Sequence, residues 1–282
     1  MMLADTHIHI WDFDQAEYAW LKGNTGVLGR TYSIGELEAE RQAVGVTKGV
    51  LVQAANNFED TDWMLKVAAE TDWIAAVVGW LPLTDSAATE HALTTTYKHN
   101  PYFKGVRHLI HDEADPKWLL QPSVIDSLII LAEHNISFDI VGVLPAHIET
   151  ALKVAAQVPG LRMVFDHLNQ PPIATAEKYG VWGSLMQEAA SHSGFYAKIS
   201  GLGLTSQKGM NWTAVDIQPY IEKVLEWFGT DRCFCGGDWP VALLAGSYTY
   251  TWTQFKQVLH HVLDDSARQK VFYANAAAFY SF

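Results

Sequence analysis

The sequence contains few cysteines: there are two in 282 residues, Cys233 and Cys235. Proteins that rely on disulfides for their stability carry many more, so a disulfide-based scaffold is excluded. One residue separates the two cysteines, which gives poor geometry for a bond between them on a strand. We therefore expect two small buried side chains that face the surrounding helices, in a protein of the reducing cytoplasm.

Positive charge is also scarce, with 19 lysines and arginines against 31 acidic residues and a formal charge of -12. Binding to nucleic acid needs a basic face, so no nucleic-acid partner is expected. No apolar run reaches a length of about 18 residues, and the first residues do not have the pattern of a signal peptide. We expect a cytoplasmic protein without a membrane partner that acts on a small-molecule substrate. The sequence leaves a homo-oligomer open.

Short β-like segments alternate with helical patterns along the chain. The helical patterns have apolar residues at a spacing of three to four, and they are long enough to connect parallel strands. Eight such units predict a (β/α)8 TIM barrel that spans residues 1–282 as a single domain. An open doubly wound sheet is the alternative, but no glycine-rich phosphate loop follows the first segment. The predicted strands, rich in β-branched and aromatic residues, cover 3–10, 49–55, 74–83, 103–110, 136–143, 162–169, 195–202 and 232–239.

The first predicted strand carries Asp5, His7 and His9 at alternating positions. In a regular strand this spacing places all three side chains on one face. The active site of a TIM barrel lies at the carboxyl ends of its strands. Two imidazoles at this place and spacing are suited to bind one metal ion. A chance pair of structural histidines is the alternative.

The sixth and eighth predicted strands also end in polar residues. His167 ends the sixth, and a core or helix-facing structural histidine is the alternative to a site residue. Strict alternation places the neighbouring Asp166 on the opposite face, where we expect it to anchor a loop or a helix end. On the eighth strand, alternation directs Phe234, Gly236 and Asp238 toward the barrel axis. Gly236 then leaves space for a ligand beneath Asp238, whose carboxylate is suited to bind a metal ion and to take a proton from water.

Three further polar residues lie on the predicted strands. Arg107, on the fourth strand, can bind a substrate carboxylate or carbonyl group through its guanidinium if it points inward. A surface or ion-paired arginine is the alternative. Gln53 ends the second strand and is expected to hydrogen-bond the substrate. Lys198, on the seventh strand, is open to two interpretations, as a site residue or as the partner in a buried ion pair.

Aromatic residues are plentiful, with 11 tryptophans. Trp11, Trp80 and Trp239 lie at predicted strand ends, and Trp20 lies in the loop after the first strand. Rings at such places are suited to stack on a sugar-like face or to exclude water, while core packing explains most of the other tryptophans. We take Trp11 and Trp239 as the predicted substrate contacts.

The ordered set of these segments resembles the amidohydrolase superfamily, and within it the branch of amidohydrolase-related lactonases. The segments ADTHIHIWD, FKGVRHLIHDE, YAKISGL and DRCFCGGDWPV are similar to landmarks of that branch and follow one another in its order. VFYANAAAFY looks like its closing helix, so the resemblance covers nearly the whole chain. It implies a distorted TIM barrel of the amidohydrolase type. It also implies a hydrolase related to fucono-, galactono- and rhamnono-lactone hydrolases and to pyrone-dicarboxylate lactonases.

The resemblance also implies roles for particular residues. His7 and His9 match the first-strand histidine pair of the family, His167 its sixth-strand histidine, Asp238 its eighth-strand aspartate and Arg107 a position near the substrate. Unlike the wider superfamily, this chain has no lysine placed for carbamylation on the fourth strand and no histidine on the fifth. One divalent metal ion, zinc in the first place, is therefore expected on His7, His9, His167 and Asp238 rather than two ions.

The reaction implied is hydrolysis of a small cyclic ester, in the first place a sugar lactone. The attacking water is activated by the metal ion or, if none is required, by Asp238 alone. Asp238, His167 and Arg107 are then the catalytic residues. Metal-dependent decarboxylation of an unsaturated or aromatic carboxylic acid on the same barrel is the alternative, and a barrel that binds a sugar or a metal without turnover is a third interpretation.

Overall fold

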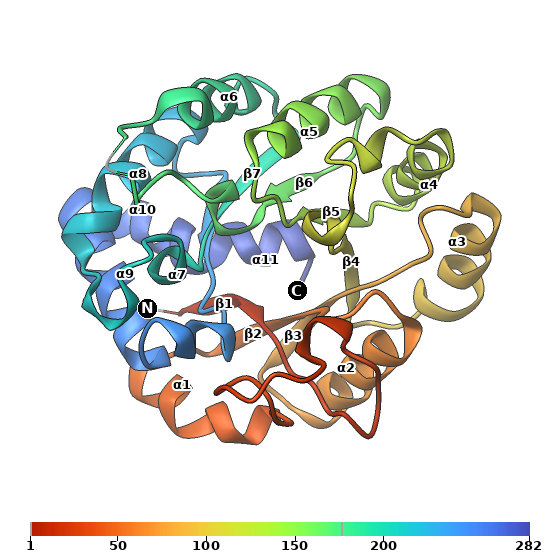
Figure 1. Cartoon of the computed structure of the whole chain (residues 1–282), viewed down its shortest axis with the longest axis horizontal. Helices are drawn as coiled ribbons and strands as arrows, with labels where there is room; N and C mark the ends of the chain where they lie inside the picture. The colour runs from red at the N-terminus through yellow and green to blue at the C-terminus, as the bar shows by residue number, and fades with distance from the viewer. Residues whose placement is uncertain (1, 176) are drawn as a thin grey trace.

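The computed structural model describes residues 2–175 and 177–282. In these residues eight parallel strands pair in the order β1 to β8, and helices surround them (Figure 1). The predicted (β/α)8 TIM barrel is thus confirmed. The strands are β1 (Ala4–Ile8), β2 (Lys48–Val52), β3 (Ile74–Gly79), β4 (Phe103–His108), β5 (Ser137–Ile140), β6 (Met163–Phe165), β7 (Phe195–Ile199) and β8 (Cys233–Cys235).

The helices connect successive strands and close the chain. Among the described residues, none is long and apolar enough to cross a membrane. They are α1 (Glu38–Val44), α2 (Phe58–Glu70), α3 (Ser86–Ala92), α4 (Pro122–Glu133), α5 (Pro145–Gln157), α6 (Gly180–Ala190), α7 (Leu202–Thr205), α8 (Ala214–Phe228), α9 (Tyr248–Val262), α10 (Asp265–Gln269) and α11 (Asn275–Tyr280). Short 3-10 or π turns are η1 (Ala19–Leu21), η2 (Ile34–Leu37), η3 (Leu93–Tyr97), η4 (Ile110–Asp112), η5 (Trp118–Leu120), η6 (Asp166–Asn169), η7 (Gly209–Asn211), η8 (Val241–Leu244) and η9 (Lys270–Ala274).

Side chains on the strands alternate between two separate cores, as the period of a strand requires. Val50 and Val52 belong to the core inside the barrel, together with Phe234 of β8. Cys233 and Cys235 belong to the core between the sheet and the helices, and they form no disulfide. The prediction that both cysteines face the helices is confirmed.

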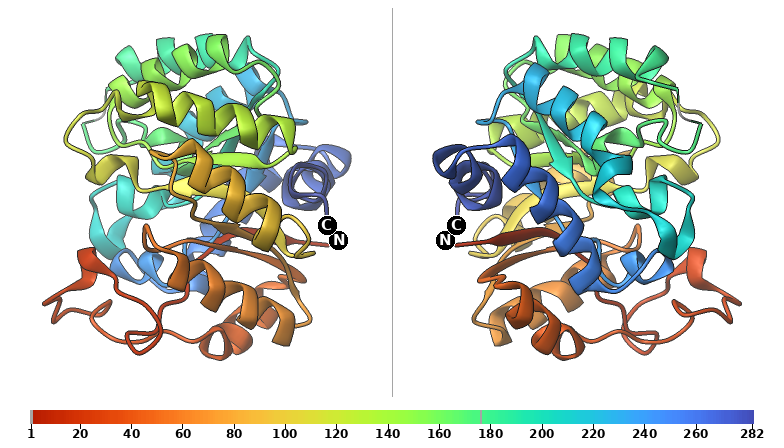
Figure 2. Two further views of the ribbon diagram at one scale, coloured as in Figure 1. Left: turned by 90° about the vertical axis from the view of Figure 1, so that its right-hand side faces the viewer. Right: turned by 90° about the vertical axis from the view of Figure 1, so that its left-hand side faces the viewer.

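The C-terminal helix α11 closes one end of the barrel. Its residues Ala276, Phe279 and Tyr280 pack against the interior core, and the Phe279 side chain is 1% exposed. Figure 2 shows α11 beside both chain termini, at the end opposite the long loop that follows β1. Because apolar side chains fill this end, a substrate can enter only at the carboxyl ends of the strands.

Two strands end sooner than the sequence predicts. β6 and β8 each have three residues, whereas strands over 162–169 and 232–239 were expected. β6 ends where residues from His167 onward adopt left-handed φ angles, and β8 ends at the glycine pair before Asp238, whose φ is +59°. The side-chain alternation of a strand does not continue through such residues, and this decides where the polar groups beyond them point.

We predict that Phe279→Ala lowers the free energy of unfolding by about 3–5 kcal/mol, because the fully buried ring leaves a cavity at the closed end of the barrel. Urea unfolding measures the change. Val215→Ala is the control, since this side chain is 74% exposed and its loss should cost less than about 0.5 kcal/mol. Equal stability of the two variants would contradict the closing role of α11.

Candidate active site

The seam between β1 and β8 brings the first group of site residues together. The Asp238 amide donates to the His7 carbonyl over 2.7 Å, and the His9 amide donates to the Trp239 carbonyl over 2.7 Å. A Cβ atom at Gly236 would lie 2.5 Å from Cβ of His7, so only glycine permits this approach. The expectation that Gly236 leaves space for a ligand is therefore wrong, because His7 fills that space.

Asp5 does not share the face of the two histidines. Its carboxylate accepts hydrogen bonds from the Gly237 amide and from the Tyr248 hydroxyl of α9, each over 2.7 Å, and so lies on the helix side of the sheet. Burial raises the pKa of Asp5 to about 6. The expected common face is wrong because the pairing of β1 with β2 shifts register between Asp5 and Ile8, which interrupts the alternation.

Both imidazoles of β1 have close polar neighbours. His9 Nδ1 lies 2.7 Å from the Val52 carbonyl oxygen, which can only accept, so Nδ1 carries the proton. His7 Nε2 lies 3.3 Å from Nη1 of Arg107 and 3.1 Å from Nε2 of His9, and His7 Nδ1 lies 3.4 Å from Oδ1 of Asp166 and 3.3 Å from Nζ of Lys198. Burial lowers the pKa of both histidines and so favours their neutral forms. His9 therefore presents an unprotonated Nε2 to Nε2 of His7.

Three of the four predicted metal ligands, His7, His167 and Asp238, each bring one ligand atom to within 4.8 Å of the others, and His9 lies beside them. His7 Nε2 and His9 Nε2 lie 3.1 Å apart, and Asp238 Oδ1 lies 3.7 and 3.6 Å from them. His167 Nε2 lies 4.0 Å from the same oxygen. Ligands bound to one zinc ion at about 2.0–2.1 Å are about 3.3 Å apart in a tetrahedron, so these separations fit a single ion.

The turn after β6 brings both Asp166 and His167 into the barrel. The Asp166 carboxylate is fully buried and lies 3.1 Å from Nη1 of Arg107 and 2.8 Å from Nζ of Lys198. The prediction that Asp166 faces the opposite way and anchors a loop is wrong. β6 ends at Phe165, and the backbone then turns left-handed at His167, so alternation no longer separates the two side chains.

A layer of buried charges supports the metal ligands from below. Lys198 Nζ lies 2.7 Å from Asp139 and 2.8 Å from Asp166, and Asp139 also accepts from the Tyr280 hydroxyl of α11 over 2.7 Å. Although burial alone would lower the pKa of Lys198, the two carboxylates raise it, so the ammonium stays charged. Two cations, Arg107 and Lys198, thereby balance two carboxylates. Lys198 is therefore a buried ion-pair partner, one of the two interpretations left open for it, and its Nζ also lies 3.3 Å from Nδ1 of His7.

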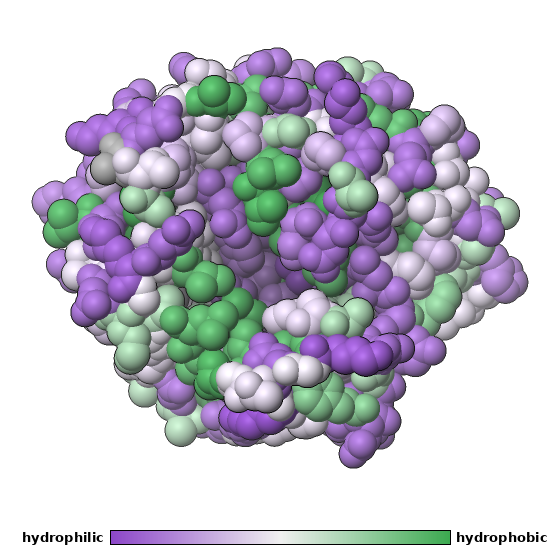
Figure 3. All heavy atoms as spheres, in the orientation of Figure 1, coloured by the Kyte–Doolittle hydropathy of each residue, from purple (hydrophilic) through white to green (hydrophobic). Residues whose placement is uncertain are grey.

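The side chains of His9, His167 and Asp238 line the floor of a cavity of about 300 Å³ at the carboxyl ends of the strands. Figure 3 shows a hollow at the centre of this face, with a hydrophilic floor and apolar patches on its rim. The lining residues are His9, Trp20, Ala54, Arg107, Leu109, His111, Asp112, Val141, Val143, His167, Gln170, Gly201, Leu204, Asp238 and Val241. Apolar walls with a few convergent polar groups are typical of small-molecule sites.

Three predicted substrate contacts lie outside this lining. Trp11 is fully buried and its indole donates to the Arg30 carbonyl. Trp239 is 3% exposed and packs edge-on against Tyr32. Gln53 is buried behind Arg107, whose guanidinium donates to the Gln53 backbone carbonyl. The three residues support the wall, and their direct contact with a substrate remains a prediction.

Other lining residues lie on loops that the sequence analysis did not place. Trp20 reaches the cavity from the loop after β1 and donates to the Ala54 carbonyl over 2.7 Å. His111 and Asp112 come from η4, and Gln170 from the turn after β6. The polar segments HLIHDE and DHLNQ were visible in the sequence, but only the observed turns tell which of their side chains face inward.

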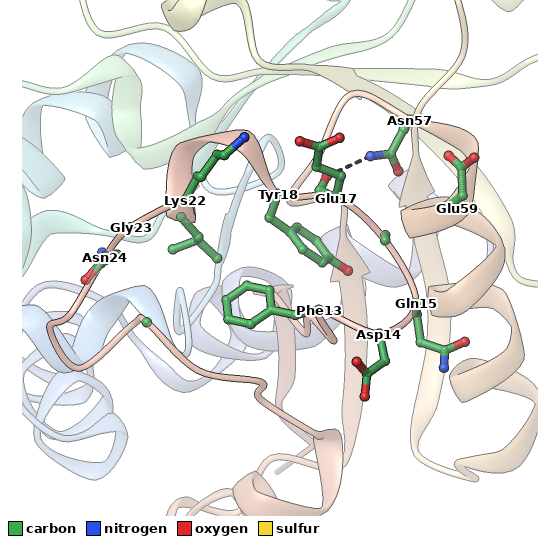
Figure 4. A pocket seen from close by; sticks show the side chains of 13 residues that line it. Phe13, Asp14, Gln15, Glu17, Tyr18, Lys22, Gly23, Asn24, Asn57 and Glu59 are labelled. Carbon is green, nitrogen blue, oxygen red and sulfur yellow. Dashed lines mark hydrogen bonds between the residues drawn. The ribbon is translucent and has the colours of Figure 1, made fainter.

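A larger hollow, of about 780 Å³, lies beneath the loop after β1 (Figure 4). Its walls carry the side chains of Asp14, Glu17, Lys22 and Glu59, which come from the surface of this loop and from α2. Among the residues that the structure describes, no group of potential metal ligands meets there as one does at Asp238. We therefore assign the active site to the smaller cavity, where buried histidines and a carboxylate share one centre.

A TIM barrel whose mouth combines two histidines of the first strand, a histidine of the sixth and an aspartate of the eighth defines the amidohydrolase class of barrels. The sequence profile of the amidohydrolase family matches residues 4–282, and the chain belongs to this family.

Several known proteins are similar to this chain. An L-fucono-1,5-lactonase from Burkholderia ambifaria is 34% identical over 281 residues, which cover 98% of this chain and 94% of the relative. A crystal structure of an amidohydrolase from Burkholderia multivorans with bound zinc is 26% identical, with a TM-score of 0.91 over the full length of both chains. A 2,6-dihydroxybenzoate decarboxylase from Rhizobium shares the fold, with a TM-score of 0.65 at 14% identity over 99% of this chain and 98% of that one.

We predict that Gly201→Ala lowers kcat/KM by about a hundredfold or more without unfolding the protein. Gly201 has a φ of +62°, and an added Cβ would lie 2.5 Å from Nδ1 of His167, so the imidazole must move. Gly209→Ala is the matched control, because Gly209 has a φ of +55° but nothing within 4 Å of the added atom. Both variants carry similar backbone strain, so equal activity would show that the position of His167 does not matter.

Proposed function

We propose that this protein hydrolyses the ring ester of a sugar lactone. One observation carries the proposal: the Nε2 atoms of His7, His9 and His167 all lie within 4.0 Å of Oδ1 of Asp238, which lines the floor of a small cavity. The relationship to an L-fucono-1,5-lactonase along nearly the full chain supports a lactone as the substrate. The two free, buried cysteines support a reducing cytoplasm as the place where it works.

The same four residues would hold one divalent ion, and we propose zinc. Imidazole nitrogens and carboxylate oxygens are ligand types that zinc accepts. The amidohydrolase of Burkholderia multivorans binds zinc on a very similar barrel. A bound ion would polarise the lactone carbonyl and lower the pKa of a water molecule. Asp166 on Nδ1 of His7 and the Val52 carbonyl on Nδ1 of His9 would keep both Nε2 atoms directed at the ion.

The residues of the chain then divide the chemistry among them. Asp238, 3% exposed at the cavity floor, accepts the proton that the attacking water loses and returns it to the ring oxygen as the ester C–O bond breaks. The product is an open-chain hydroxy acid. Arg107 lies 3.3 Å from His7 Nε2, so its charge is placed to stabilise the negative charge that develops on the carbonyl oxygen.

The charges around the cavity favour a neutral substrate over a carboxylic acid. Among the lining residues that the structure describes, Arg107 is the sole arginine or lysine, and it is already paired with Asp166. A carboxylate substrate would meet Asp112 and Asp238, and apart from the proposed metal ion no lining side chain of the described residues supplies an unpaired cation to balance it. This argues against the decarboxylase alternative, and the likeness to the decarboxylase extends to the fold alone.

The test is a panel of aldonolactones, L-fucono-1,5-lactone included, assayed by acid release, with metal content measured on the same sample. We expect hydrolysis of at least one lactone, about one equivalent of divalent metal per chain, and loss of activity on chelation that zinc restores. Full activity in metal-free protein would overturn the metal part of the proposal. Carbon dioxide release from aromatic or unsaturated acids, with no lactone hydrolysed, would overturn the reaction itself.

Asp238→Asn is expected to lower kcat by at least about a thousandfold, because the amide cannot take the proton from water. The fold should be retained, since the Asp238 backbone and not its side chain makes the bond to His7. Circular dichroism and thermal unfolding verify the fold beside the kinetic assay. Asp112→Asn is the control. Asp112 lines the same cavity, 3.5 Å from His111, but is not one of the four predicted metal ligands. If Asp238→Asn kept most of its turnover, another base would have to be found.

A further inference from the structure

The backbone after β6 has a conformation that L-amino acids rarely adopt. His167, Leu168, Asn169 and Gln170 have φ angles of 54°, 51°, 50° and 53° in succession, and none of the four is glycine. Each left-handed residue costs roughly 1–2 kcal/mol, and runs of them are rare. Such strain persists only where the surrounding structure enforces it, and it concentrates at functional sites.

Contacts from three other parts of the chain hold this turn. The Trp182 indole of α6 donates to the Leu168 carbonyl over 2.8 Å. The Asn169 side chain donates to the Leu144 carbonyl before α5 over 3.3 Å, and the His167 amide donates to Oγ of Ser200 after β7 over 3.2 Å. The turn is therefore built into the barrel rather than left to the loop.

The left-handed turn decides which side chains reach the cavity. The Gln170 amide donates to the His167 carbonyl over 2.9 Å, which closes a turn of three residues. With about three residues per turn, side chains at positions i and i+3 point the same way. His167 and Gln170 accordingly both line the active-site cavity, and Gln170 also borders a second hollow beside Pro172.

The Gln170 side chain is free to bind a ligand. The side chain is half-buried. Within the part of the chain that the structure describes, its carboxamide group makes no hydrogen bond. The nearby walls offer mostly apolar side chains. Apart from Arg107 and the predicted metal ligands, the other charged or titratable lining residues are His111 and Asp112, which lie 3.5 Å from each other. An amide both donates and accepts, as a pair of sugar hydroxyls requires.

We propose that Gln170 is a specificity-determining residue that binds the ring hydroxyls of the lactone, while His167 stands beside the ester group. This inference rests on the proposed function and deepens it. The strained turn fixes the distance between the reacting centre and the hydroxyl contact. It thereby favours a polyhydroxylated lactone over an unsubstituted one.

The experiment compares kcat/KM of Gln170→Ala for an aldono-1,5-lactone and for δ-valerolactone, which has the same ring without hydroxyls. We expect a loss of about tenfold to hundredfold with the aldonolactone and a change of less than about twofold with δ-valerolactone. Gln170→Asn retains an amide and tolerates a left-handed φ, so it should recover part of the loss. Thermal unfolding is followed for each variant.

Gln207→Ala is the matched control, because Gln207 has a φ of +56°, is exposed and lies outside the cavity lining. It should alter neither substrate. An equal loss with both lactones in Gln170→Ala, or no loss with either, would overturn the inference while leaving lactone hydrolysis intact. A wild-type protein that does not prefer the hydroxylated lactone would overturn it in the same way. Hydrolysis of neither lactone by the wild type would instead overturn the proposed function on which it rests.

Discussion

The backbone hydrogen bonds between β1 and β8 are the interaction on which the site depends. They close the barrel, and they also join residues that are more than 200 positions apart, so that His7 and His9 meet Asp238. The glycine pair before Asp238 makes this approach possible. Gly236 leaves room for the His7 side chain, and Gly237 both donates to Asp5 and leaves room for its carboxylate. The contacts that close the barrel therefore also bring His7, His9 and Asp238 together.

The same seam explains why the barrel needs a charged layer beneath its mouth. A histidine that binds a metal ion through Nε2 keeps its proton on Nδ1, and the carboxylate beside Nδ1 of His7 is Asp166. A buried carboxylate in turn requires a cation, since an isolated charge in the interior is costly. Arg107 and Lys198 supply it, and Asp139 with the Tyr280 hydroxyl completes the environment of Lys198. The polar layer therefore extends from the site to the C-terminal helix.

Much of this arrangement was predictable from the sequence, up to the point where strands end. Alternation within regular strands correctly placed Arg107 inside the barrel, and the two cysteines outside it. The same rule failed for Asp5, because the pairing of β1 with β2 shifts register. It failed for Asp166 because β6 ends at Phe165, the residue before it. The tryptophans illustrate a second limit. Trp11 and Trp20 both follow β1, and only the path of the loop shows that Trp20 is the one beside the cavity.

The wrong predictions of side-chain direction share a physical cause, and the same cause brings the polar side chains of the site together. Three neighbouring strands leave the sheet through left-handed residues: His167 after β6, Gly201 after β7 and Asp238 after β8. A strand that continued regularly would send every second side chain to the helices, and one strand end could then contribute one group at each level of the mouth. A left-handed residue breaks this alternation, so that Asp166 and His167, adjacent in sequence, both reach the centre. The strain at these strand ends is therefore the means by which a small cavity acquires more polar groups than the alternation of its strands allows.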